Sequence, residues 1–190
     1  MNEAKKNRAL FLDRDGVINE EIGYLAHAKD VRFMPGLFSL CRTAQTLGYK
    51  LVVVTNQAGI ARGYYTEEQY EAVMQWMRER LTREGIALDA VYYCPDHPDF
   101  PHSRKCDPSW RKPGPGMLLA AAKDLALDMA ASVYVGDRCT DVGAGNAAQV
   151  GKMFLLKGVE TAECAGEYEV VTELQAVERW LSARIKLSTE

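Results

Sequence analysis

The chain has 190 residues, 47% of them hydrophobic and 26% charged, with a formal net charge of −3. We expect one globular domain over residues 1–190, and the slightly acidic balance argues against nucleic acid as a partner. No apolar stretch approaches the roughly 20 residues that cross a bilayer and no export signal is recognised, so we expect a cytoplasmic protein without a membrane partner.

The first predicted element is a buried strand over residues 9–12, followed by Asp13, Asp15 and Gly16. Four apolar residues bounded by a turn signal are typical of such a strand. Side chains two residues apart point to the same side of a strand, so both carboxylates are expected to face one small volume. They tolerate each other best around a cation such as Mg²⁺. A solvated turn is the alternative, because Asp and Gly are common turn residues.

Helices and strands alternate along the rest of the chain. Helices are predicted from Pro35 to about Leu47, between Thr66 and Gly85, from Pro115 to about Leu127, in the segment up to Gln149, and from Thr172 onward; strands are predicted over 50–54, 91–93, 132–135 and 152–156. This alternation is typical of a parallel sheet covered by helices on both faces. The irregular stretch 94–114 is long for a compact domain, which indicates a function or an internal staple.

Polar residues gather where the predicted strands end. Asp13 and Asp15 follow the first strand, Thr55, Asn56 and Gln57 the second, and Asp137 the fourth, while Arg111 and Lys112 close the long loop. Ligands of open parallel sheets bind beyond the carboxyl ends of the strands, where the strand order reverses. If the first strand is central, carboxylates for a metal and two cations converge there, and that set suits phosphoryl transfer.

Four segments, DRDGVINE, VVVTNQAGIARG, RKPGPGM and VGDRCTD, resemble in order the four motifs of the haloacid dehalogenase (HAD) superfamily of aspartate-nucleophile phosphatases. The resemblance covers roughly residues 9–156. It implies a Rossmann-like three-layer α/β/α sandwich with a mostly parallel central sheet. No large cap is inserted between the motifs. A capless domain of this size is expected to be a monomer.

Within the superfamily, TNQAGIARG, YYCPDHP and RKPGPGMLL are most similar to the heptose bisphosphate and histidinol phosphatase family. That resemblance implies a Mg²⁺-dependent enzyme that removes the C7 phosphate of a heptose 1,7-bisphosphate through an aspartyl-phosphate, in nucleotide-activated heptose biosynthesis that feeds lipopolysaccharide or another glycoconjugate.

The resemblance also implies roles for individual residues. Asp13 is the expected nucleophile and Asp15 the acid and then the base, an exchange that needs a carboxyl beside the nucleophile. Mg²⁺ is expected on Asp13, Asp137 and the backbone carbonyl of Asp15. The expected contacts to the phosphoryl group and the rest of the sugar phosphate come from Thr55, Asn56, Gln57, Arg111, Lys112 and the loop from Glu21 to Tyr24. Arg138 either reaches the substrate or is a surface cation, and Asp141 either supports the metal through water or caps a helix.

The loop CPDHPDFPHSRKCDPSWRKP departs from the family pattern, in which Cys-x-His and Cys-x-Cys hold zinc. Asp96 occupies the usual histidine position, and no second cysteine follows Cys106. Cys94, His97, His102 and Cys106 are an alternative set of ligands for a structural Zn²⁺. The other hypothesis is a loop that packs without metal. The five cysteines of the chain are expected to be free thiols or metal ligands rather than a disulfide framework.

Two other functions stay open at this point. One is a different small-phosphate-ester hydrolase of the same fold, such as histidinol phosphatase, since loops alone select the substrate. The other is a signalling receiver domain that accepts phosphate on aspartate without turnover. Asp15 separates the two classes, because only turnover of an ester needs an acid/base at that position.

Overall fold

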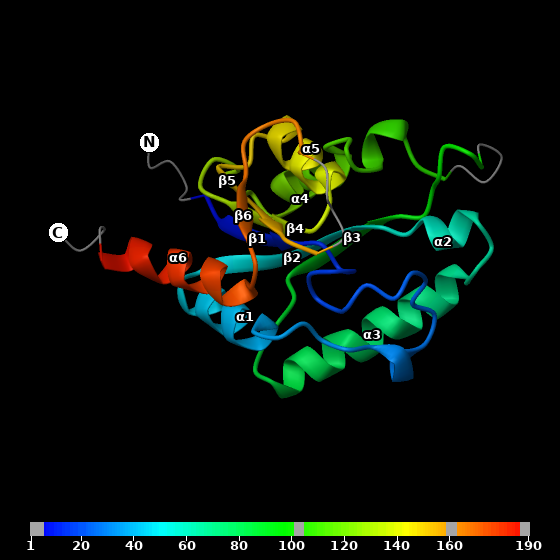
Figure 1. The fold of residues 1–190 in the computed structure, drawn as a ribbon, viewed down its shortest axis with the longest axis horizontal. Coiled ribbons are helices and arrows are strands. Elements are labelled where there is room, and N and C mark those ends of the chain that lie inside the picture. Colours follow the sequence, from blue (N-terminus) through cyan, green and yellow to red (C-terminus); the bar gives the residue numbers. More distant parts are fainter. Residues whose placement is uncertain (1–5, 101–104, 159–162, 187–190) are drawn as a thin grey trace.

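The computed structural model describes residues 6–100, 105–158 and 163–186. Six parallel strands form one open sheet in the order β3-β2-β1-β4-β5-β6 (Figure 1). The strands are β1 (Arg8–Leu12), β2 (Tyr49–Asn56), β3 (Ala90–Cys94), β4 (Val133–Gly136), β5 (Lys152–Leu156) and β6 (Glu169–Val171). The first strand, β1, lies in the middle of the sheet. β2 and β3 extend the sheet on one side of β1, and β4 to β6 extend it on the other, so the strand order reverses between β1 and β4. Open parallel sheets bind ligands in the crevice at such a point.

Helices cover both faces of the sheet, as the alternating pattern predicted (Figure 1). One face carries α1 (Leu37–Thr46), α3 (Glu67–Arg83) and α6 (Leu174–Lys186), and the other carries α4 (Gly116–Asp124) and α5 (Cys139–Ala147). Alternate residues of one strand enter the two cores: Leu10 and Leu12 pack on the side of α1, Ala9 and Phe11 on the side of α4. Because successive strand side chains point to opposite faces and both faces are covered, residues 9–12 of β1 are all apolar and completely buried, whereas Arg8 is partly buried.

The expected three-layer α/β/α sandwich with a parallel central sheet is therefore confirmed, and several details differ from the sequence-based expectation. The predicted loop between β2 and α3 contains a short helix, α2 (Ala58–Ala61), and β6 was not predicted. Among the described residues of the stretch 94–114, Cys94 ends β3, Pro108–Trp110 form a 3₁₀ turn, and the remainder is irregular as expected. None of the helices in the described ranges is long and apolar enough to cross a membrane.

The expectation that the cysteines are free thiols was wrong for two of them. Cys139, at the start of α5, forms a disulfide with Cys164 in the segment that leads to β6. Their sequence separation is 25 residues, and only the packing of that segment over α5 brings them together. Cys41, Cys94 and Cys106 are free.

Candidate active site

The carboxyl ends of β1, β2 and β4 bring the predicted catalytic residues together. β1 pairs with β2 on one side and with β4 on the other, and the backbone N–H of Asp13 continues the ladder by donating to the Val135 carbonyl (3.0 Å). Gly16 follows with a positive φ of 82°, and a Cβ at this position would overlap the Asp137 carboxylate. A glycine is therefore needed for the loop after β1 to pass so close to the end of β4.

Lys112 is the buried cation of the site. Its Nζ lies 3.0 Å from Oδ2 of Asp13 and 2.5 Å from Oδ1 of Asp141, and it also donates to the Val54 carbonyl (2.9 Å). Burial lowers the pKa of this amine, but the carboxylates of Asp13 and Asp141 together raise the pKa by more than burial lowers it. The pKa of Lys112 therefore lies above its ordinary value. A charged amine beside the expected nucleophile suits the binding of phosphoryl oxygens.

Asp13 and Asp137 form a site that needs a cation. Burial, then Asp141 and Asp15, raises the pKa of Asp13 to about 7 against the opposing effect of Lys112. Burial and then Asp13 raise the pKa of Asp137 to about 8. Both carboxylate oxygens of Asp137 are buried without a hydrogen-bond partner. Unpaired oxygens of this kind are costly unless they bind a proton or a metal, so this pair fits Mg²⁺, which prefers carboxylate ligands.

Asp141 belongs to the same cluster but is already occupied by protein groups. One ligand oxygen from each of Asp13, Asp137 and Asp141 lies within 4.8 Å of the others. Oδ2 of Asp141 accepts from the backbone N–H of Asp137 (3.2 Å) and of Arg138 (3.0 Å), at the start of α5. Its Oδ1 accepts from Tyr134 Oη (2.9 Å) and pairs with Lys112. Of the two readings of this residue, the contacts favour the helix-capping carboxylate, which also holds Lys112.

Asp15 lies beside Asp13 in a cradle of donors. The Arg14 guanidinium contacts both of its oxygens through Nε and Nη2 at 2.7–3.1 Å. Asn19 Nδ2 and Gln57 Nε2 each donate to it at 3.0 Å. Burial alone would raise the pKa of Asp15, but the Arg14 charge and these hydrogen bonds outweigh it and lower that pKa.

The three polar residues at the end of β2 have different hydrogen-bond partners. Thr55 is buried and accepts from Gln57 Nε2 at its Oγ1 (2.9 Å). Asn56 exchanges two hydrogen bonds with the backbone of Lys112, at 3.0 and 3.1 Å, and so fixes the cation to the sheet. Gln57, which was predicted to bind substrate, is buried and lies behind Asp15 rather than on the wall of the pocket.

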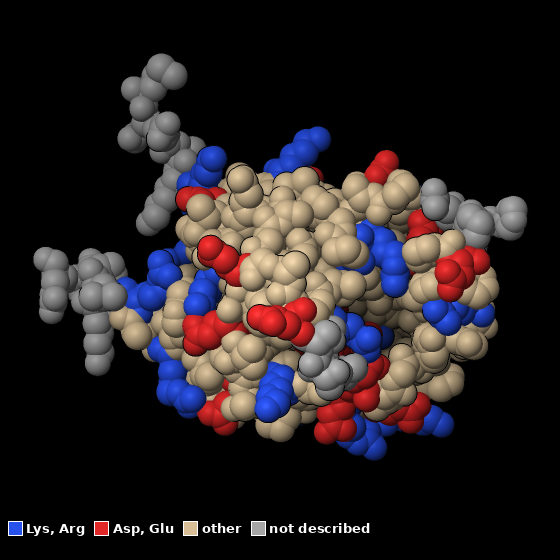
Figure 2. Space-filling model, turned by 45° about the horizontal axis from the view of Figure 1, so that its top comes forward, with Lys and Arg blue, Asp and Glu red and all other residues tan. Residues whose placement is uncertain are grey.

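These groups open into a cavity of about 480 Å³, and basic side chains surround a hollow in the right half of Figure 2. Of the predicted site residues, the cavity wall contains Asp13, Asp15, Glu21, Tyr24, Thr55, Asn56, Arg111, Lys112 and Arg138. Asp137 and Gln57 lie behind this wall. On one side, Arg138 pairs with Glu21 (2.8 Å), so the loop after β1 meets the loop after β4.

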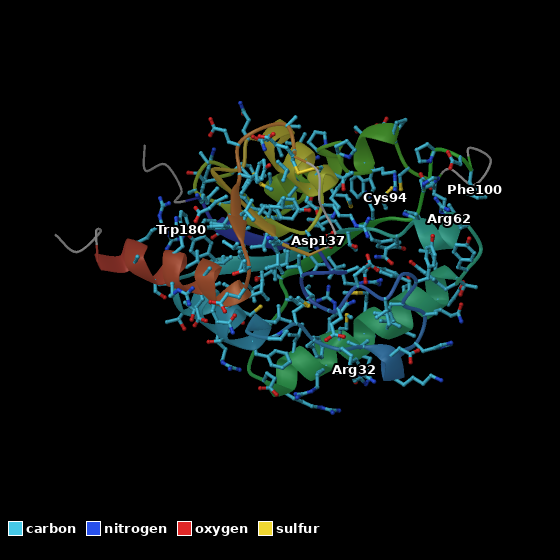
Figure 3. All side chains as sticks on the ribbon, in the orientation of Figure 1. Arg32, Arg62, Cys94, Phe100, Asp137 and Trp180 are labelled. Atoms are coloured by element: carbon cyan, nitrogen blue, oxygen red, sulfur yellow. A yellow bond between two sulfur atoms is a disulfide. The ribbon has the colours of Figure 1, made fainter. Side chains whose placement is uncertain are left out.

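The wall also contains His97, which was predicted as a zinc ligand, and three polar residues that sequence reasoning missed: Arg62, Tyr65 and Thr140. Arg62 Nη2 lies 2.9 Å from Nε2 of His97, and the Arg111 guanidinium donates to the Asp96 carbonyl (2.9 Å). Figure 3 shows Arg62 and Cys94 on the α2 side of the molecule, with Asp137 nearer its centre. For Arg62, the sequence offered one indication of a role in the site: a basic residue in the glycine-containing segment after β2.

The predicted zinc ligands do not form a metal site in the part of the chain that the structure describes. His102 lies outside the described residues, and Cys94, His97 and Cys106 are absent from the one cluster of metal-ligating groups found among the rest. Asp96, at the usual histidine position, accepts instead from the backbone N–H of Lys105 and Cys106 at 2.8–3.0 Å. The three expected zinc ligands that the structure describes, Cys94, His97 and Cys106, therefore do not gather around one point.

Comparison with known proteins agrees with the geometry. A family model described as HAD-hydrolase-like matches residues 109–177. Among solved structures, a HAD-like phosphatase from Mesorhizobium loti superposes with a TM-score of 0.84 at 35% identity, over 95% of this chain and 87% of that chain. D,D-heptose 1,7-bisphosphate phosphatase from B. bronchiseptica, crystallised with magnesium and phosphate, has a TM-score of 0.82 at 27% identity, over 93% and 99% of the two chains.

The sequences of curated relatives are closer still. The D-glycero-β-D-manno-heptose-1,7-bisphosphate 7-phosphatase of Yersinia pestis is 40% identical over 94% of this chain and 97% of its own. The D-glycero-α-D-manno-heptose-1,7-bisphosphate 7-phosphatase of Burkholderia mallei is 49% identical over 80% of both chains. By these similarities the chain belongs to the heptose-1,7-bisphosphate 7-phosphatase family of HAD-like hydrolases.

Proposed function

We propose that this protein is a Mg²⁺-dependent phosphatase that removes the C7 phosphate of a D-glycero-D-manno-heptose 1,7-bisphosphate. The observation that carries the proposal is the arrangement at the pocket floor: Asp13 touches Lys112, and Asp15 opens into the same cavity. Relatives at 40–49% identity bear the name of this activity.

The reaction divides into two displacements at phosphorus. In the first, an Asp13 carboxylate oxygen attacks, the bond to the sugar oxygen breaks, and Asp15 gives its proton to that oxygen. In the second, water attacks the aspartyl-phosphate, gives a proton to Asp15, and releases inorganic phosphate with Asp13 restored. Arg14 favours the ionised form of Asp15 in the free protein, and the negative charge of a bound phosphoryl group favours its protonation.

The remaining groups hold charge and position. Asp13 and Asp137 would hold Mg²⁺, which neutralises the phosphoryl oxygens when bound. Lys112 and the Thr55 hydroxyl would hold those oxygens in place, worth several kcal/mol for preorganised donors of this kind. The backbone carbonyl of Asp15 would be a further ligand of the metal.

The far side of the cavity would accept the second phosphate. Arg111 and Arg62 both contribute to that wall, and His97, which contacts Arg62, lines it as well. Two guanidinium groups in a cavity of this size suit an anion held bidentately. The curated relatives include enzymes named for the α and for the β anomer, so the anomer is left to measurement.

The proposal also covers the domain organisation, location and oligomeric state of the protein. The chain works as a single cytoplasmic domain and as a monomer. A structural Zn²⁺ in the loop 94–106 is a separate hypothesis that rests on the sequence and on His102. Metal analysis of reduced protein purified without chelator decides it: one zinc per chain supports it, and none removes it.

The alternative is another small-phosphate-ester hydrolase of the same fold, such as a histidinol phosphatase. Its specific support is the exposed Tyr24, which lies on the cavity wall and contacts Tyr64 (ring centroids 4.3 Å apart). An aromatic wall of this kind also suits a flat or apolar leaving group.

The covalent step is testable by trapping. In Asp15→Asn the base of the second displacement is gone, so mixing with Mg²⁺ and 4-nitrophenyl phosphate is expected to add one phosphoryl group to the protein, on the peptide that contains Asp13. The double variant Asp13→Asn/Asp15→Asn is the control and should gain none. Continued phosphate release by Asp13→Asn would reject the aspartyl-phosphate route.

A further inference from the structure

The acid/base carboxylate is oriented by residues that the reaction itself does not explain. Arg14 follows the expected nucleophile directly, yet its side chain is only 1% exposed and turns away from the cavity. Gln57 is equally buried. Both side chains converge on Asp15, which does face the cavity.

Arg14 is fixed in place from several sides. Its guanidinium lies over the ring of buried Tyr70, 5.4 Å from the centroid. Its backbone carbonyl accepts from Ile18 and Asn19, and this tight turn returns the Asn19 amide to Asp15. A buried guanidinium is costly without an ionised partner, and Asp15 is the carboxylate that contacts it. Each residue therefore fixes the other.

Gln57 fixes the opposite side of Asp15. Its Nε2 donates both to Oδ2 of Asp15 (3.0 Å) and to Oγ1 of Thr55 (2.9 Å). Its Oε1 accepts from the Tyr65 hydroxyl (2.6 Å), which sets the direction of the amide. Because Thr55 Oγ1 accepts from Gln57, the Thr55 hydroxyl proton is left to donate toward the cavity. One amide thus orders the acid/base and a phosphoryl-binding hydroxyl together.

We propose that Arg14 and Gln57, with Tyr65 hydrogen-bonded to Gln57, are positioning residues that hold the Asp15 carboxyl on the leaving-oxygen side of the transferring phosphoryl group. This inference rests on the proposed function and deepens it. It predicts that the three residues matter most when the leaving oxygen needs a proton, because they act through Asp15.

The test compares two esters in the presence of Mg²⁺: a sugar phosphate, whose alkoxide is a poor leaving group, and 4-nitrophenyl phosphate, whose leaving group is stable as an anion. General acid catalysis contributes roughly 10²–10⁴-fold. Gln57→Met and Arg14→Met are expected to lower kcat/KM on the sugar phosphate by about 100-fold or more, and kcat/KM on the aryl ester by less than about tenfold. The comparison uses kcat/KM because it reports the first displacement, in which only the sugar oxygen needs the proton of Asp15. Arg14→Lys should recover part of the loss.

Two tyrosines give a matched pair of milder variants. Tyr65→Phe removes the hydroxyl that orients Gln57, whereas the Tyr70 hydroxyl is buried without a partner. Tyr65→Phe is expected to lower kcat/KM on the sugar phosphate about five- to tenfold, an order-of-magnitude figure for one hydrogen bond. It should leave kcat/KM on the aryl ester unchanged. Tyr70→Phe should change neither ester. Should Arg14→Met fail to unfold cooperatively, this pair and Gln57→Met carry the test.

A double-variant cycle separates positioning from general support of the fold. If Arg14 acts through Asp15, Asp15→Asn/Arg14→Met should lose no more on the sugar phosphate than Asp15→Asn alone, since coupled residues are non-additive. Equal losses of kcat/KM on the two esters, or fully additive losses in the cycle, would overturn the inference. A wild-type protein that hydrolyses neither ester is a different result and would overturn the proposed function instead.

Discussion

The floor and the rim of the cavity are built in different ways. The floor, defined by Asp13, Lys112, Asp137 and Asp141, comes from two strand ends, from the first turn of α5 and from a lysine bonded back to the sheet. The rim, defined by Arg62, Asp96, His97 and Arg111, comes from loops that a few hydrogen bonds connect. A shared floor with changeable loops lets one fold run one chemistry on many substrates. We therefore assign the reaction to the floor and the choice of substrate to the rim.

The largest expected effect is on the floor. Asp13→Asn removes the proposed nucleophile and should lower kcat on every phosphate ester by at least about 10³-fold. The fold should survive, because Lys112 keeps its contact with Asp141. Kinetics and thermal unfolding measured together check both statements. Residual turnover above about 1% of wild type would mean that the floor does not supply the nucleophile.

Metal binding should stabilise the floor in a pH-dependent manner. Without metal the folded-state pKa values of Asp13 and Asp137 are raised to about 7 and about 8. Groups with raised pKa values favour the folded state below their unfolded pKa, near 4, and this contribution is lost as pH rises through 7–8. Mg²⁺ at about 100 times its Kd should restore about 2.7 kcal/mol at pH 8, and less at pH 5.5, where protons compete.

Thermal unfolding with and without Mg²⁺ measures this difference, and about 5–10 °C is expected at pH 8. Asp137→Asn is the control, since it removes the carboxylate whose oxygens have no protein partner. An equal Mg²⁺ shift at both pH values, or an undiminished shift in Asp137→Asn, would contradict the assignment of the metal to the floor.

On the rim, Asp96 is expected to matter for stability more than for chemistry. Its carboxylate accepts from two backbone N–H groups, and Asp96→Asn replaces one acceptor by a donor, at a cost of about 1–2 kcal/mol. Asp99→Asn, at an exposed position in the same loop, should stay within about 0.5 kcal/mol. Denaturant unfolding measures both. Equal effects of the two variants would show that Asp96 does not staple the loop.

The smallest expected effect, that of Arg111 on the rim, distinguishes most clearly between the roles of the floor and the rim. Arg111→Ala should lower kcat/KM for a bisphosphate about tenfold, or about 1.4 kcal/mol, and leave 4-nitrophenyl phosphate within about threefold. Arg42→Ala, which removes a half-exposed cation outside the cavity, controls for net charge. Equal losses on the two esters would place Arg111 with the floor rather than the rim.

The floor could be predicted from the sequence because strands impose order. Apolar runs located β1, β2 and β4, and Asp13, Thr55 and Asp137 had to lie at or just beyond their carboxyl ends. Once β1 was taken as central, convergence followed from topology alone.

The rim could not be predicted in the same way, since loops have no period. Arg62 and His97 meet across 35 residues, and nothing local to either residue indicates the contact. The role of Gln57 was missed for a related reason: only the backbone path after β2 turns its amide inward to Asp15. The three-residue β6 and the Cys139–Cys164 disulfide also depend on tertiary packing, which residue patterns alone do not encode.

The most direct test of the central claim is phosphate release with Mg²⁺ from both anomers of heptose 1,7-bisphosphate, beside histidinol phosphate and 4-nitrophenyl phosphate. We expect kcat/KM for one heptose anomer to exceed the others by about 100-fold, which corresponds to about 2.7 kcal/mol of transition-state discrimination. Uniformly weak turnover of all four esters would contradict the heptose assignment while leaving the aspartate chemistry of the floor in place.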